Sequence, residues 1–163
     1  MPLTRGEVAF HQKTKADCFN EAWVYLEKTR RSARDDEQLL TLAHTARYHA
    51  GVVGTARNRA IGDWQISRAY AALGEARLAQ MFAESCRRLC QANDLKDLRC
   101  TASEALARAH AVGGDIQAAQ RHIADARKCL DETPLDREDR EIYLGQIRDT
   151  ERLIRKRGAR TGT

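Results

Sequence analysis

The chain has 163 residues, of which 42% are hydrophobic, with ten glycines, two prolines and a net charge of +5. This length and composition are typical of one globular domain with a real core, and they exclude collagen-like and disordered chains. Nothing approaches the ~18 consecutive apolar residues of a membrane span, and the first residues lack the apolar core of a secretory signal. We therefore expect a cytoplasmic protein that does not bind membranes.

The positive charge is concentrated at one end of the chain. Residues 151–163 hold five basic residues and one acid, a charge of +4, so the other 150 residues carry only +1. No aromatic side chain is interleaved with these charges to stack on bases. We expect residues 157–163 to form a flexible, solvated basic tail, and we regard nucleic-acid binding through it as the weaker interpretation.

Helix-breaking signals recur about every twenty residues. They centre near 34, 54, 74, 94, 114 and 134, where glycine, asparagine, aspartate or proline residues gather. Asp94 and Asp115 are expected to cap the helices that follow them. Apolar residues between them recur every three to four positions, and the scarcity of β-branched runs excludes a sheet. The sequence predicts an all-α fold of about seven helices, over residues 5–31, 36–52, 57–73, 76–92, 96–112, 116–131 and 136–156.

Two segments repeat at an interval of 40 residues. Residues 68–89 align with residues 108–129 without a gap, and Gly74 falls on Gly114. The repeating unit is a helical hairpin, which cannot bury both of its apolar faces unless copies stack. We predict a single domain over residues 1–156, with stacked antiparallel hairpins at about 5–52, 57–92 and 96–131 and a C-terminal capping helix at 136–156.

The pattern resembles the tetratricopeptide repeat, in which a large residue, a glycine four positions later and an alanine five after that mark the hairpin. Tyr70, Gly74 and Ala79 match it, and so do the residues 40 positions later, His110, Gly114 and Ala119. The chain departs from the family in its period, which is 40 rather than 34, and in lacking the terminal proline. It resembles bacterial proteins of this shape that have no assigned activity. The resemblance implies right-handed stacking and a concave groove, and it implies no chemistry.

In that family the first helix of each hairpin lines the groove, with outward residues six and two positions before the large residue. The resemblance thus places Trp64, Arg68, Glu104 and Arg108 in the groove. His44 lies ten residues before Gly54, and Trp64 lies ten after it, so counting helical rise puts the two at one height. Tyr48 is one turn from His44. The candidate partner-binding site is therefore made of His44, Tyr48, Trp64, Arg68, Glu104 and Arg108.

These residue types favour a non-enzymatic protein or peptide interaction module, an adaptor or scaffold. Arginine binds carboxylates with two parallel hydrogen bonds, and tryptophan and arginine are enriched at interface hot spots. We expect the partner to offer an acidic segment or a carboxylate terminus. Two alternatives stay open: Glu104 and Arg108 merely form an i,i+4 pair on a helix surface, or His44, Tyr48 and Trp64 line a pocket that binds or transforms a small molecule.

No catalytic motif, metal site or cofactor signature is present. His44 and His49 are five residues apart, and on a helix they point about 140° away from one another, so they do not share an ion. The five cysteines are expected to be reduced thiols, and Cys86 occupies a small packing position of the repeat. We also expect a homodimer, because a short repeat array leaves an apolar end surface unless its terminal helices cover it.

Overall fold

The computed structural model describes residues 2–161 and contains seven α-helices and no strand within them. This confirms the all-α prediction. In chain order the helices are α1 (Arg5–Leu26), α2 (Ala33–Val53), α3 (Ala56–Ala72), α4 (Ala76–Ala92), α5 (Leu98–Gly113), α6 (Ile116–Glu132) and α7 (Arg137–Thr161).

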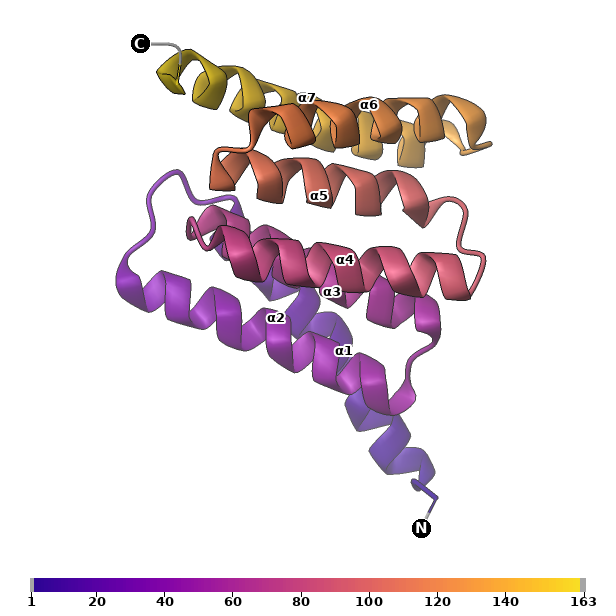
Figure 1. Ribbon diagram of the computed structural model, residues 1–163. Helices are drawn as coiled ribbons and strands as arrows, with labels where there is room; N and C mark the ends of the chain where they lie inside the picture. The colour runs from indigo at the N-terminus through magenta and orange to yellow at the C-terminus, as the bar shows by residue number, and fades with distance from the viewer. Residues whose placement is uncertain (1, 162–163) are drawn as a thin grey trace.

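Consecutive helices form antiparallel hairpins that stack in chain order (Figure 1). The hairpins are α1 with α2, α3 with α4 and α5 with α6, and α7 packs against both α5 and α6. The odd-numbered helices also contact one another in sequence, which makes them one continuous layer. The stack therefore has α1 and α2 at one end and α7 at the other, where Ile147 and Ile154 of α7 are buried against the third hairpin.

Gly74 and Gly114 close equivalent turns. Gly74 has a φ of 82 degrees and Gly114 a φ of 84 degrees. This left-handed conformation is costly for residues with a side chain. In each turn the residue after the glycine donates its amide to the carbonyl five residues earlier, Glu75 to Tyr70 over 2.9 Å and Asp115 to His110 over 3.0 Å. The 40-residue repeat of the sequence is thus a repeat of backbone geometry.

Two local expectations were wrong. The first turn covers residues 27–32 instead of centring on 34, because Ser32 caps α2: its hydroxyl accepts the Asp35 amide and the Asp35 carboxylate accepts the Ser32 amide. Asp94 was expected to cap a helix, but it adopts the left-handed conformation itself, with a positive φ, after the C-terminus of α4.

The last helix is longer than expected. It continues to Thr161, so residues 157–161 extend α7 where a flexible tail was predicted, and the last two residues of that tail lie outside the described residues. None of the helices in residues 2–161 combines the length and the apolar character that a membrane-spanning helix needs.

Small residues let the helices approach closely. Alanines such as Ala60, Ala83 and Ala105 are almost fully buried between α3, α4 and α5. A Cβ on Gly62 would lie 2.7 Å from Cδ of Arg47, so this glycine makes room for the Arg47 side chain of α2. This close approach gives Gly62 a packing role inside α3, where a glycine otherwise costs about 1 kcal/mol of helix stability relative to alanine.

Candidate functional site

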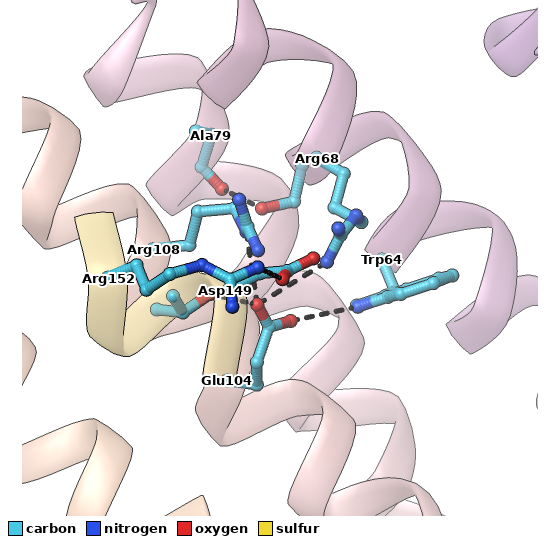
Figure 2. Close-up of polar contacts among 9 residues, drawn as sticks. Trp64, Arg68, Ala79, Glu104, Arg108, Asp149 and Arg152 are labelled. Carbon is cyan, nitrogen blue, oxygen red and sulfur yellow. Dashed lines mark hydrogen bonds and ion pairs between the residues drawn. The ribbon is translucent and has the colours of Figure 1, made fainter. Parts of the chain in front are cut away.

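A buried carboxylate connects three helices of the odd-numbered layer. Glu104 of α5 is 1% exposed, and its two oxygens accept from Trp64 Nε1 at 3.4 Å, Arg68 Nη1 at 3.4 Å and Arg108 Nε at 3.0 Å. The hydroxyl of Thr150, from α7, donates to the same carboxylate. Figure 2 shows Trp64 and Arg68 of α3, and Arg108 of α5, converging on Glu104.

Charge at this point is out of balance, because two guanidinium groups share one carboxylate. Burial raises the pKa of Glu104, but the charges of Arg108 and Arg68 and the Thr150 hydrogen bond outweigh it, and the net pKa is lowered. Burial and the neighbouring Arg108 lower the pKa of Arg68 to about 10, so Arg68 stays protonated at neutral pH. The cluster of Arg68, Glu104 and Arg108 therefore keeps one net positive charge. Among the residues that the structure describes, Nη2 of Arg108 finds no hydrogen-bond partner.

Aromatic rings hold Arg68 in place. Its guanidinium carbon lies 5.5 Å from the ring centre of Trp23 and 5.5 Å from that of Trp64, which is cation–π distance. The two indole rings are themselves 5.6 Å apart. The side chain is therefore fixed by a carboxylate on one side and by indoles on another.

These residues border a cleft of about 770 Å³ between the C-terminal end of α1 and α7, with α3 and α5 contributing its remaining walls. Its lining includes three arginines, Arg68, Arg108 and Arg157, and two acids, Glu27 and Asp149. The cleft has more positive than negative side chains, and its volume lies within the range of ligand pockets.

A second, smaller cavity adjoins the cleft and is mainly apolar. It has a volume of about 300 Å³ and shares Trp23, Ile142 and Gln146 with the cleft. Aromatic and aliphatic side chains supply most of the rest of its lining, which includes Phe19, Ile61, Trp64, Leu98 and Tyr143. Ile142 is 50% exposed. So large an apolar residue is usually more deeply buried. The two cavities together place an apolar surface beside guanidinium groups.

Four of the six predicted site residues are brought together: Trp64, Arg68, Glu104 and Arg108. Arg68 and Arg108 line the cleft and Trp64 lines the adjoining cavity, while Glu104 lies beneath them as their anchor. The i,i+4 pair of Glu104 and Arg108 does form, but it is buried and joined to α3 and α7, unlike a pair on a helix surface.

His44 and Tyr48 do not join this cluster. His44 of α2 has its Nε2 3.1 Å from the Tyr70 hydroxyl and packs against the ring of Phe82, and burial lowers its pKa. Tyr48 is 65% exposed and touches the edge of the His49 ring. Lying at the same height as Trp64 does not bring His44 to the site, because α2 is an even-numbered helix and the site lies on the odd-numbered layer. Neither His44 nor Tyr48 lines the cleft or the adjoining cavity.

The two terminal helices contribute residues that were not predicted from the sequence. Trp23 of α1 lies 41 residues before Trp64, one position off the repeat interval, so the spacing of the two tryptophans was a usable signal. Thr150, Ile142 and Gln146 come from α7, which has no counterpart in the aligned repeats, and no sequence pattern marked them.

No ion-binding cluster occurs in the described part of the chain. Within residues 2–161, histidine, cysteine, aspartate and glutamate side chains nowhere gather in groups of three or more that could hold a metal. Cys86 is 1% exposed and packs in the core with Ala83 and Ala105, which confirms its predicted packing role.

Comparison of the chain with protein-family models, with curated proteins and with solved structures finds no match to any of them.

Proposed function

We propose that this protein is a non-enzymatic interaction module, an adaptor or scaffold, that binds a segment of a partner protein in the cleft between α1 and α7. The observation that carries the proposal is the pairing of that cleft with the apolar cavity beside it. A peptide has both an anionic group, at an acidic side chain or its C-terminus, and apolar side chains. The anionic group would pair with the guanidinium groups of Arg68, Arg108 and Arg157, and the apolar side chains would enter the aromatic cavity.

Preorganisation supports binding at this surface. Immobilising a long side chain at an interface costs about 0.5–1.5 kcal/mol. Arg68 and Arg108 are already held by Glu104, and Arg68 also lies against two indole rings. A ligand carboxylate meeting these two arginines would not have to order them.

The resemblance to tetratricopeptide arrays also supports this proposal. In those arrays the first helix of each hairpin lines a concave groove, and here α1, α3 and α5, the first helices of their hairpins, all contribute to the cleft wall. The cleft differs in being closed on one side by α7, so we propose a short bound segment and not a long extended one.

The test uses a display library of short peptides with free C-termini, screened against the full-length protein. Binding is read from intrinsic tryptophan fluorescence, because both tryptophans of the chain, Trp23 and Trp64, line the two cavities. The blocking variant is Gly145→Phe: Gly145 lines the cleft, and a Cβ placed on it meets no atom within 4 Å, so a large side chain enters the cleft without displacing the core.

The matched control is Gly6→Phe, since Gly6 is also helical, lies at the start of α1 and has equally open surroundings. We expect selected peptides to lose at least about tenfold in affinity with Gly145→Phe, or about 1.4 kcal/mol, and none with Gly6→Phe. Equal binding by both variants would place recognition elsewhere, and a library that yields no ligand would remove the proposal.

A further inference from the structure

Two cysteines from different helices are in direct contact. Cys100 of α5 and Cys129 of α6 have their sulfur atoms 2.6 Å apart, although the residues are 29 positions apart in the sequence. Heavy atoms that are not bonded usually stay about 3.5–4.0 Å apart, and the bond of a disulfide is about 2.05 Å. The two helices therefore hold the sulfurs closer together than an ordinary non-bonded contact and not far from the length of a disulfide bond.

The two sulfurs differ in their access to solvent. Cys100 is 1% exposed, and burial and its contact with Cys129 raise its pKa to about 12, so it remains a thiol at neutral pH. Cys129 is only partly buried and lines a surface pocket of about 380 Å³ together with Lys96, Arg99 and Lys128. A small oxidant from solvent therefore reaches Cys129 first.

Cationic side chains outnumber acidic ones around Cys129. The pocket lining holds three cationic side chains, Lys96, Arg99 and Lys128, against two acids, Asp125 and Glu132. The Thr133 hydroxyl donates to the Cys129 carbonyl, and its oxygen lies 3.8 Å from the sulfur of Cys129 and 3.9 Å from that of Cys100. It therefore contacts both sulfurs.

We propose that Cys129 and Cys100 are an oxidative modification site, at which hydrogen peroxide forms a reversible disulfide between α5 and α6. The Cys129 thiol gives up its proton and its sulfur attacks a peroxide oxygen; an S–O bond forms, the O–O bond breaks, and the departing hydroxide takes that proton to become water. Cys100 then attacks the Cys129 sulfur; the S–S bond forms, the S–O bond breaks, and the second hydroxide leaves as water with the Cys100 proton. Two thiols are oxidised, and one peroxide is reduced to two waters.

The disulfide covalently joins the two helices of the third hairpin. Its two cysteines are 29 positions apart, and by restricting the unfolded chain the bond raises the melting temperature by about 5–10 °C. This proposal does not depend on the proposed function, because Cys129 lines a different pocket from the cleft.

The other cysteines provide controls within the same chain. Cys86 and Cys90 are four residues apart on α4. At that helical spacing the Cβ atoms lie roughly one turn apart, which is farther than the Cβ separation of a disulfide. Cys18, on α1, is half-buried.

The experiment treats the reduced full-length protein with stoichiometric hydrogen peroxide and measures intact mass, melting temperature and the positions of thiols left open to alkylation. We expect a mass loss of about 2 Da, a bond that maps to Cys100 and Cys129, the stated rise in melting temperature, and full reversal by dithiothreitol. Cys86→Ser with Cys90→Ser should retain this behaviour.

Two single variants decide the chemistry. Cys129→Ser should abolish the mass loss, and Cys100→Ser should leave a sulfenic acid on Cys129 that a 1,3-diketone reagent traps. Cys100→Ala serves as a second variant, since a buried serine hydroxyl could itself destabilise the core. A disulfide that maps to another pair, a mass loss that survives Cys129→Ser, or a sulfenic acid trapped on Cys18 instead would overturn the proposal.

Discussion

Replacing Glu104 by glutamine tests whether the buried carboxylate stabilises the fold. The substitution keeps the shape of the side chain and removes its charge, leaving Arg68 and Arg108 adjacent with no counter-ion between them. The carboxylate lies 3.4 Å from Arg68 and 3.0 Å from Arg108. At an effective dielectric constant of about 20, each such pair contributes about 5 kcal/mol of attraction. Removing the charge also removes the solvation cost of burying it, and this gain offsets part of the lost attraction.

We therefore expect a loss of about 3–5 kcal/mol in the free energy of unfolding, the usual effect of removing one partner from a buried ion pair. The matched control is Glu84→Gln, because Glu84 pairs with Arg87 at 2.7 Å while both side chains stay more than a third exposed. That change should cost less than about 1 kcal/mol. Urea unfolding followed by circular dichroism at neutral pH measures both.

The pH dependence gives an independent check on the same carboxylate. The folded-state pKa of Glu104 lies below its ordinary value of 4.5, so the unfolded chain binds a proton more readily. The stabilisation from Glu104 is thus fully present above pH 4.5 and is lost as the pH falls through the lower folded-state pKa. The difference between wild type and Glu104→Gln should shrink over that range. A loss no larger than that of the exposed control at neutral pH would refute the reasoning.

Three further substitutions test a turn glycine, a glycine inside α7 and His44, which lies outside the site predicted for it. Gly114 has a positive φ, so Gly114→Ala should destabilise the protein by about 1 kcal/mol because alanine is strained there. Gly145 lies inside α7 with open space around its Cβ position, so Gly145→Ala should stabilise the protein by about 0.5–1 kcal/mol; thermal unfolding distinguishes the two, and equal signs would contradict the assigned geometry. His44 has a folded-state pKa lowered from 6.5 by burial, so the unfolded chain binds its proton first and stability should decline as the pH falls through 6.5. His44→Gln should flatten that decline, and an unchanged slope between pH 7 and 5 would show that His44 is not its source.

The sequence by itself determined the helices and their repeat. Helical periodicity and the glycines at 74 and 114 are local signals, because a left-handed turn residue and a nearby cap depend only on the few residues around them. The position of the first turn was wrong although its signal is also local. The capping box of Ser32 and Asp35 is visible in the sequence, but the regular spacing of the other turns was given more weight.

Only the tertiary structure decided what the site is made of. Glu104 receives hydrogen bonds from residues 40 positions before it and 46 positions after it, and Cys100 meets a partner 29 positions away. The resemblance to the tetratricopeptide repeat placed Trp64, Arg68, Glu104 and Arg108 in one groove, and residue spacing gave only the height of His44 relative to Trp64. Spacing could not fix which helices face each other across the cleft, because the placement of α1 and α7 depends on how side chains pack between helices far apart in the chain. For that reason His44 was assigned to a surface it does not share, and Thr150 and Trp23 were overlooked.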